Sequence, residues 1–266
     1  MNSLGYMPEP GRRASLSQRL FGSRRFSRAI EFRIMIGWLG HEGRALDLGA
    51  GNGEFSAQLS LRGYRVVAFD LDATALRSGR EQHRCAIEWV AGDATRLPFA
   101  DGAFDCVLCN SAIEHFSDDQ ATLREVARVI KAGGQLVVTT DSLPSHPSRW
   151  LRLIPASWRR EGLQSNVDLA KAIADSHQKR HHVVHFYDAE RLNTLLREHG
   201  FRVEAWRYYM NGVFSQGIFE MHLLLNALDF YNRLSRRLYP LFAPFTFPVR
   251  PRRPGYGLAV HARRSA

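Results

Sequence analysis

The chain between residues 44 and 140 alternates short apolar runs with amphipathic stretches. Several runs have the length and the β-branched or aromatic content of buried strands, namely Ala45–Leu48, Arg65–Phe69, Ile87–Ala91, Phe104–Cys109 and Gln135–Thr139. Between the last two, Asp118 and Asp119 can cap a helix whose apolar residues recur at helical spacing until Gly133 and Gly134 end it. Strands that alternate with crossover helices predict βαβ units, and hence an α/β fold with a doubly wound, mostly parallel sheet.

The pattern continues toward the C-terminus. We expect a helix from Asp188 to Glu198, a strand over Phe201–Tyr208 and a last strand over Gly257–His261. Residues 1–26 hold prolines, glycine and scattered arginines without an apolar period, which indicates a flexible basic leader; a targeting segment is the alternative reading. The remainder, residues 27–266, is predicted to be a single domain.

Composition agrees with a folded protein and adds a charge. Of the 266 residues, 45% are hydrophobic and 23% are charged, and the formal net charge is +10. Such a charge favours anionic partners, but it does not choose among nucleic acid, phospholipid and a phosphorylated substrate. The sequence has no apolar stretch of membrane-spanning length and no secretory signal, so we expect a cytoplasmic protein.

The cysteines do not suggest a disulfide framework. There are three of them, Cys85, Cys106 and Cys109, which is an odd number and typical of a reducing compartment. Cys106 and Cys109 have C-x-x-C spacing, but residues three apart on a strand point to opposite faces. They are expected to be small core residues, and no metal site is predicted.

The strongest chemical signal is the segment Ala45–Phe55, a buried strand that runs through Gly49, Gly51 and Gly53 into a helix. Glycine permits a tight turn and lets the backbone approach a ligand closely. The spacing is G-x-G-x-G, whereas the dinucleotide fingerprint is G-x-G-x-x-G. A pyrophosphate site is therefore the poorer match.

Three more loops follow strands that would end at the same edge of the sheet. Asp70 ends the second strand nineteen residues after Gly51, where a carboxylate can accept hydrogen bonds from both ribose hydroxyls, and Asp72 suits a helix N-cap. Asp93 follows the third strand and could accept from an adenine amino group. Residues 110–116 follow the fourth strand, so the four loops together describe a nucleoside-shaped site.

The stretch from Ala45 to Leu136 resembles the class I methyltransferase family, in its small-molecule branch typified by quinone-biosynthesis enzymes. The resemblance rests on four segments in order: LDLGAGNGEF, VVAFDLD, AGDATRLPFADGAFDCVLCNSAIEHF and LREVARVIKAGGQLVV. A weaker match follows at HFYDAERLNTLLREHGFRVE. The resemblance implies a Rossmann-like seven-stranded sheet whose last strand is antiparallel and formed by Gly257–His261. It also implies that S-adenosyl-L-methionine is the cofactor and that a core over residues 44–140 binds it.

The resemblance also implies roles on the methionine side of this cofactor. Gly49, Gly51 and Gly53 would face the methionine part, and Asp47 would help to hold its ammonium group. Asn110 would lie near the sulfonium. From the residues alone, Asp47 could instead satisfy backbone donors at a strand end.

On the nucleoside side, the resemblance implies that Asp70 binds the ribose and that Asp93 meets the adenine. Ala94 would supply a backbone contact. The family's usual K-P-G-G turn reads Lys131-Ala132-Gly133-Gly134 here, a departure that touches no ligand.

His115 is the candidate catalytic residue, because imidazole titrates near neutral pH and follows the fourth strand at the ligand edge. A packing or positioning role is the alternative. A second group, His177, His181, His182 and His185, lies in a basic stretch. Metal chelation, contact with substrate or phosphate, and a solvated basic loop are its three interpretations.

The segment Phe214–Phe247 is not explained by the family core. It predicts an amphipathic helix, and aromatic residues and arginines follow as far as Arg253. This combination suits an anionic membrane interface, where the protein would be peripheral. Packing over the sheet or against a second subunit, as in a homodimer, suits it equally.

These observations predict methyl transfer from S-adenosyl-L-methionine to a small-molecule or lipid-linked acceptor, at oxygen or carbon. The segments 142–186 and 206–250 are expected to cover the acceptor. Residues 110–113 read Asn-Ser-Ala-Ile and not Asn-Pro-Pro-Tyr, which argues against methylation of nucleic acid bases. A nicotinamide-dependent oxidoreductase and an inactive protein that binds the cofactor are the alternatives.

Overall fold

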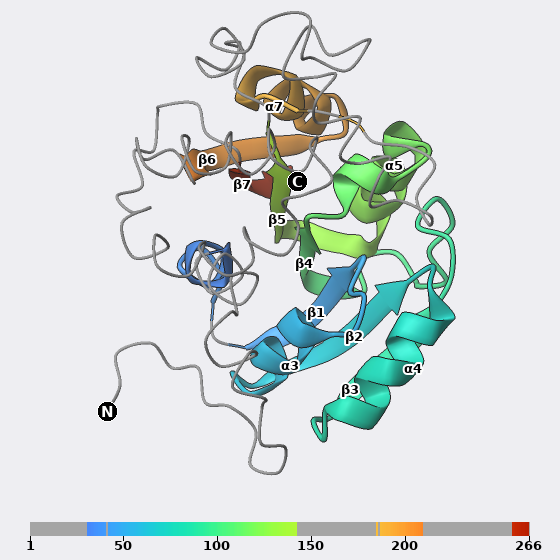
Figure 1. Cartoon of the computed structure of the whole chain (residues 1–266). Helices are drawn as coiled ribbons and strands as arrows, with labels where there is room; N and C mark the ends of the chain where they lie inside the picture. Colours follow the sequence, from blue (N-terminus) through green and yellow to red (C-terminus); the bar gives the residue numbers. More distant parts are fainter. Residues whose placement is uncertain (1–30, 41, 143–184, 186, 210–256, 266) are drawn as a thin grey trace, which may run out of the picture.

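The computed structural model describes residues 31–40, 42–142, 185, 187–209 and 257–265 (Figure 1). After a helical stretch at 31–36, the described elements follow in the order β1 (Gly43–Leu48), α3 (Glu54–Ser60), β2 (Tyr64–Asp70), α4 (Ala73–Gln82), β3 (Ile87–Ala91), β4 (Phe104–Asn110), η1 (Ile113–His115), α5 (Asp119–Val129), β5 (Ile130–Asp141), α7 (Ala189–Glu198), β6 (Phe201–Tyr209) and β7 (Gly257–Arg264). The leader, three of the four clustered histidines and residues 214–253 lie outside this description.

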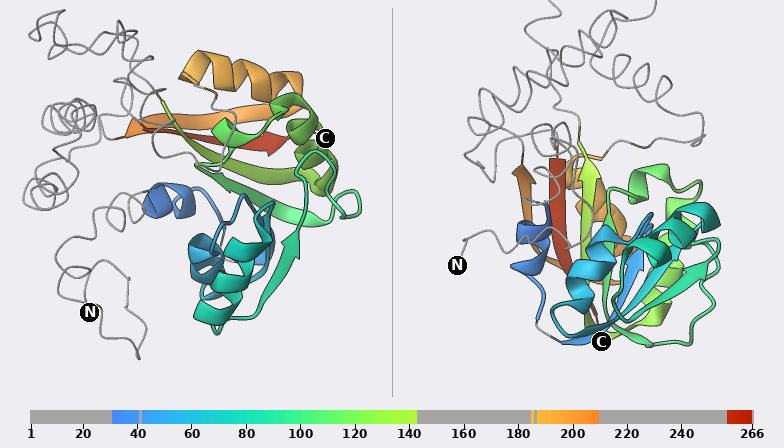
Figure 2. Two further views of the ribbon diagram at one scale, coloured as in Figure 1. Left: turned by 45° about the vertical axis from the view of Figure 1, so that its right-hand side comes forward. Right: turned by 60° about the horizontal axis from the view of Figure 1, so that its bottom comes forward.

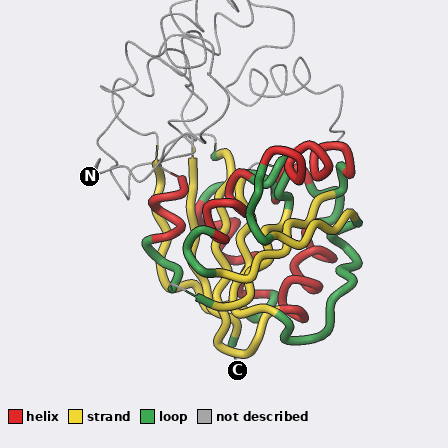
Figure 3. Tube along the Cα trace, turned by 90° about the horizontal axis from the view of Figure 1, so that it is seen from below, coloured by secondary structure: helices red, strands yellow, loops and turns green. Residues whose placement is uncertain are grey.

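The strands form one seven-stranded sheet in the order β3-β2-β1-β4-β5-β7-β6. Strands β1 to β5 pair in parallel, and β7 is antiparallel to both of its neighbours, β5 and β6. Helices lie on both sides of the strands (Figure 3). The predicted doubly wound sheet with an antiparallel last strand is confirmed.

Alternate residues of each strand serve the two faces of the sheet, as the pleat requires. On one face, Val107 and Cys109 of β4 join a core with Leu123 of α5 and Leu192 of α7. On the other face, Cys106 packs with residues of α3 and of the 31–36 stretch. Figure 2 shows α7 and the 31–36 helix on opposite sides of the sheet. The expected separation of the two cysteines is confirmed.

The predicted helix starts are confirmed, but one helix end was predicted wrongly. The side chains of Asp72, Asp118 and Asp188 accept backbone N–H groups at the starts of α4, α5 and α7. Helix α5, however, ends at Val129, before Gly133 and Gly134.

The reason for the early end is the pairing of β5. Ile130 is extended, fully buried and opposite Phe104, while Gln135 lies opposite Cys106. Residues 131–134 therefore bulge from β5 opposite a single residue of β4. Gly133, with φ 73°, gives this bulge its sharp bend.

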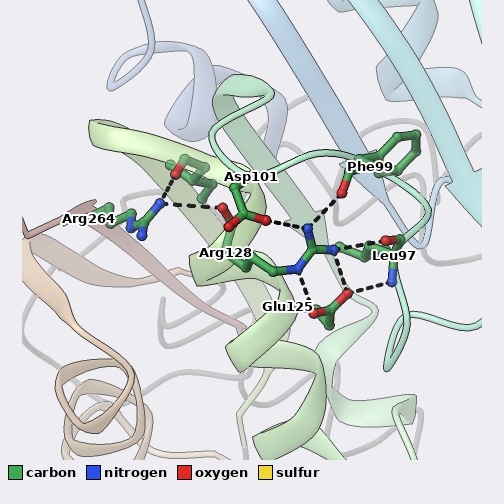
Figure 4. Close-up of polar contacts among 7 residues, drawn as sticks. Leu97, Phe99, Asp101, Glu125, Arg128 and Arg264 are labelled. Atoms are coloured by element: carbon green, nitrogen blue, oxygen red, sulfur yellow. Dashed lines mark hydrogen bonds and ion pairs between the residues drawn. The ribbon is translucent and has the colours of Figure 1, made fainter.

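Arg128 of α5 anchors the loop between β3 and β4 (Figure 4). Its guanidinium donates to both carboxylate oxygens of Glu125 at 2.8 Å and to Asp101 Oδ1 at 2.8 Å. It also donates to the carbonyl oxygens of Phe99 at 2.7 Å and Leu97 at 2.9 Å. Glu125 in turn accepts the Leu97 N–H at 2.8 Å, and the hydrogen bond from Arg128 holds the pKa of Glu125 below its usual value. One planar fork thus fixes the loop that begins at Asp93.

Replacing Arg128 with lysine should lower the free energy of unfolding, because an ammonium group cannot reach the two carbonyls and both carboxylates at once. We expect a loss of about 1.5 to 3 kcal/mol, the range for hydrogen bonds to charged groups. Urea unfolding followed by circular dichroism measures it. Arg124→Lys on the exposed side of α5 is the matched control, with an expected change within about 0.5 kcal/mol. Equal losses in the two variants would disprove the anchoring role.

Candidate functional site

The carboxyl ends of four parallel strands meet at one edge of the sheet. Leu48 pairs with Phe69, Asp70 with Ala91, and Asn110 with Thr139, so β1 to β5 end at neighbouring levels. The carboxyl ends of β1, β2 and β4 and the loops that follow β1, β3 and β4 contain the sequence-predicted site residues. The structure thus brings these loops together, and their ligand roles stay predictions.

The turn after β1 is a left-handed glycine turn. Gly49, Gly51 and Gly53 have φ angles of 75°, 56° and 71°, a region that residues with a Cβ rarely occupy. The N–H groups of Gly49 and Ala50 both donate to the carbonyl oxygen of Phe69, at 2.8 and 3.0 Å. The turn is therefore fixed to the end of β2.

The three glycines differ in what surrounds them. A Cβ on Gly49 would lie 2.4 Å from Ala112 Cβ, and one on Gly53 would lie 2.3 Å from the Trp89 ring. A Cβ on Gly51 would meet no atom within 4 Å. Gly49 permits close packing of the loop after β4 and Gly53 that of Trp89 in β3, whereas Gly51 borders open space at the edge of the sheet.

Asp70 links the glycine turn to the start of α4. Its Oδ2 accepts the Gly51 N–H at 2.7 Å, and its Oδ1 accepts the Asp72 N–H at 2.8 Å. Each carboxylate oxygen has two lone pairs, so both oxygens keep one for a further donor. This arrangement suits a diol such as that of a ribose.

Asp93 and Ala94 lie just after β3. Asp93 is exposed, and its Oδ1 accepts the Thr95 N–H at 2.9 Å. Hydrogen bonds from Thr95 lower the pKa of Asp93, so the group is ionised and able to accept at neutral pH. The part of the site that is predicted to face the adenine therefore presents a hydrogen-bond acceptor.

The loop after β4 is fixed to β5. Thr139 Oγ1 donates to Asn110 Oδ1 at 2.7 Å, and the Ser111 N–H donates to the Thr139 carbonyl oxygen at 2.9 Å. Ser111 has φ 46°, and among the described non-glycine residues it alone has a positive φ. Such conformations cluster at functional sites, so Ser111 marks this loop for function. The sequence analysis did not single it out.

Asp47 and His115 lie at different depths. Asp47 is only 1% exposed, and the Ser56 hydroxyl donates to its Oδ2 at 2.5 Å. Its partner is thus a side chain of α3, which the sequence analysis also missed. His115 is half-buried at the end of η1. Its role as a base and the role of Asp47 toward an ammonium group both stay predictions.

The clustered histidines are largely outside the described residues. His185 is described, and its main-chain N–H donates to the Glu114 carbonyl oxygen at 2.8 Å. The described ranges contain no group of three or more His, Cys, Asp or Glu that could hold a metal ion.

Two surface hollows lie outside the four loops. One of about 300 Å³ is lined by Tyr64, Lys131 and Gln135 at the amino ends of the strands. The other, of about 480 Å³, lies between Asp119 of α5 and Arg191 of α7. Neither contains a predicted site residue, and ligands of open parallel sheets bind at the carboxyl edge. We therefore base the site on the glycine turn.

Comparison with known proteins identifies a matching family and several relatives. The family described as "Methyltransferase domain" matches residues 46–138. A demethylmenaquinone methyltransferase from Corynebacterium kroppenstedtii is 31% identical over 171 residues, which is 64% of this chain and 72% of that relative. Matches to further demethylmenaquinone methyltransferases span 42% to 59% of their lengths.

Solved structures share the fold at low identity. An S-adenosylmethionine-dependent methyltransferase from Mesorhizobium loti has a TM-score of 0.59 at 21% identity, over 90% of this chain and 100% of its own. The [4+2]-cyclase SpnF has a TM-score of 0.56 at 18% identity, over 90% and 83%. At these identities the likeness concerns the fold alone.

Gly51→Val should abolish the binding of S-adenosyl-L-methionine, because a branched side chain would occupy the open space beside the turn. Gly133→Val is the matched control: Gly133 also has a positive φ, of 73°, and open surroundings, but lies in the β5 bulge. We expect comparable stability losses of about 1 to 3 kcal/mol in both variants, and loss of binding only in Gly51→Val. Calorimetric titration that shows unchanged affinity in Gly51→Val would exclude this turn from the cofactor site.

Asp70→Ala should weaken cofactor binding by about 1.5 to 3 kcal/mol, the cost of a lost charged hydrogen-bond acceptor. Asp72→Ala is the control two residues away, since it removes the α4 cap but leaves Asp70 in place. It should cost about 1 kcal/mol of stability and leave the dissociation constant unchanged. If a folded Asp70→Ala variant binds as tightly as Asp72→Ala, the ribose assignment is wrong.

Proposed function

We propose that this chain, which belongs to the class I S-adenosylmethionine-dependent methyltransferase family, methylates a small or lipid-linked acceptor at oxygen or carbon. The observation that carries the acceptor class is the 31% identity to a demethylmenaquinone methyltransferase over 72% of that relative's length. A hydroxylated aromatic ring such as a reduced quinone offers both oxygen and carbon as nucleophiles. We take demethylmenaquinol as the first acceptor to test.

The described residues fit the cofactor. The open space at Gly51 borders a turn in which Gly49, Gly51 and Gly53 carry no side chain, and Asp70 keeps one lone pair on each oxygen. Gly49, Gly51, Gly53, Asp47 and Asn110 would hold the methionine side. The nucleoside side would lie against Asp70, Asp93 and Ala94.

When bound, S-adenosyl-L-methionine supplies a methyl group that is activated by its bond to a sulfonium centre. Transfer of this methyl group leaves a neutral thioether. The contribution of the chain is then chiefly geometric, because holding two reactants in line can supply about 7 to 11 kcal/mol at best. The loop from Asn110 to His115, fixed to β5, is the part of the described site on which we place the acceptor. For a hydroxyl acceptor, we assign the removal of its proton to His115.

The chain enters and leaves the sheet at this same edge. Asp141, Gly257 and Tyr209 are register partners across β5, β7 and β6, so the described ends beside residues 143–184 and 210–256 lie together. This supports our proposal that the segments 142–186 and 206–250 cover the acceptor.

Association with an anionic membrane through residues 214–253 stays a prediction, as does a homodimer. In the described ranges, no helix is long and apolar enough to cross a bilayer. A lipid-linked acceptor would give the predicted interfacial segment a purpose.

The two alternative functions are separated by different observations. The G-x-G-x-G spacing and the family membership argue against a nicotinamide-dependent oxidoreductase. An inactive or repurposed cofactor-binding protein is the stronger rival, since the same fold occurs in a [4+2]-cyclase. Only turnover separates this rival from the proposed enzyme.

Incubation of the purified protein with methyl-deuterated S-adenosyl-L-methionine and demethylmenaquinol in micelles should give a product that carries the label, detected by mass spectrometry. Gly51→Val should give none, and Gly133→Val should retain turnover. Catechols and extracted lipids in parallel test the broader acceptor class. Cofactor binding without labelling of any acceptor would favour the inactive protein, and label in nucleic acid would refute the acceptor class.

A further inference from the structure

Both ends of the loop that follows β4 are held by consecutive residues of β5. Thr139 bonds to Asn110 and Ser111 at the start of the loop. At the far end, Glu114 of η1 contacts the next two β5 residues. Its Oε2 accepts from the Thr140 hydroxyl at 3.0 Å, and its Oε1 accepts the Asp141 N–H at 3.4 Å.

Glu114 also contacts a third segment and lies deep in the protein. Its carbonyl oxygen accepts the main-chain N–H of His185 at 2.8 Å. Glu114 is only 2% exposed, whereas its neighbour His115 is half-buried. One buried acid thus connects η1, the end of β5 and residue 185.

The surroundings of Glu114 do not suit a charge. Within the described part of the chain it has no ion pair with Lys, Arg or His. The titratable groups that act on it or feel its charge from neighbouring elements are Cys109 of β4, Asp141 of β5 and Tyr209 of β6. Burial, and then the charge of Asp141, raise the pKa of Glu114 to about 8.

We propose that Glu114 is a positioning residue that fixes the Ile113–His115 turn against β5 and so sets the place of His115 beside the acceptor. The proposal rests on the proposed function for its catalytic consequence. The contacts hold both oxygens of the carboxyl group in place: Oε2 accepts from the Thr140 hydroxyl and Oε1 accepts from the Asp141 N–H.

A neutral Glu114 predicts the direction in which the stability of the folded protein changes with pH. Its pKa in the folded protein lies above the value of about 4.3 for an unfolded chain. Its contribution to stability is therefore fully present below about pH 4.3 and is lost as the pH rises to about 8. Glutamine reproduces one donor and one acceptor without this loss. The Tm of Glu114→Gln should exceed that of the wild type by a margin that grows from pH 5 to pH 9.

The catalytic test compares Glu114→Gln with Glu114→Ala and Thr140→Val. Glutamine should keep kcat at neutral pH and extend activity to higher pH. Alanine should lower kcat by about 10- to 100-fold, the scale of a small misplacement near reacting atoms. Thr140→Val, which removes only the hydroxyl partner, should lower kcat in the same direction. The dissociation constant for S-adenosyl-L-methionine should stay within twofold in all three, because none lies on the glycine turn.

Two results would overturn the proposal. If the Tm values of the wild type and of Glu114→Gln change with pH in parallel, Glu114 is not held neutral. A kcat for Glu114→Gln as low as for Glu114→Ala would show that the carboxyl group acts chemically. If Glu114→Ala does not fold, Glu114→Gln and Thr140→Val still decide. Failure of the proposed function would appear separately, as cofactor binding without turnover in the wild type, while the Tm comparison needs no acceptor.

Discussion

The hydrogen bond from the Gly51 N–H to Asp70 Oδ2, at 2.7 Å, determines the geometry of the cofactor edge. It requires the ends of β1 and β2 to lie side by side, which their parallel pairing provides, and it requires a left-handed Gly51. Ala112 of the loop after β4 packs against Gly49, and Trp89 of β3 packs against Gly53. Side chains at these glycines would push both residues away, so the conformation of the turn sets its distance from β3 and from the loop after β4.

The sequence predicted what depends on local pattern. The starts of α4 and α5 were predicted because an aspartate cap acts within three residues along the chain, and the start of α7 was predicted from its apolar pattern. The end of α5 was missed because Gly133 and Gly134 have the composition of a helix stop, whereas the buried pairing of Ile130 with Phe104 starts β5 earlier. Tertiary pairing outweighed a local signal there.

The sequence alone did not predict contacts between residues that are far apart along the chain. The partner of Asp47 is Ser56, the partner of Asn110 is Thr139, and Glu114 lies against Thr140, 26 residues later in the chain. None of these pairs has a spacing that marks it. The order of the loops along the sheet edge was predictable, because parallel strands place their carboxyl ends together, but the attachment of η1 to β5 through Glu114 needed burial and distances.

The charge at this edge differs from that of the chain as a whole. The formal net charge is +10, yet Asp47, Asp70 and Asp93 lie at or just beyond the carboxyl ends of β1, β2 and β3. Carboxylates suit a cofactor that carries ammonium and sulfonium cations and an adenine amino donor. With the hydroxyl acceptor that we propose, the acceptor side would have the opposite requirement, since a hydroxyl that loses its proton becomes an anion. A charged Glu114 on that turn would repel this anion, because charges in the protein interior are poorly screened. An uncharged Glu114 would add no such repulsion beside His115.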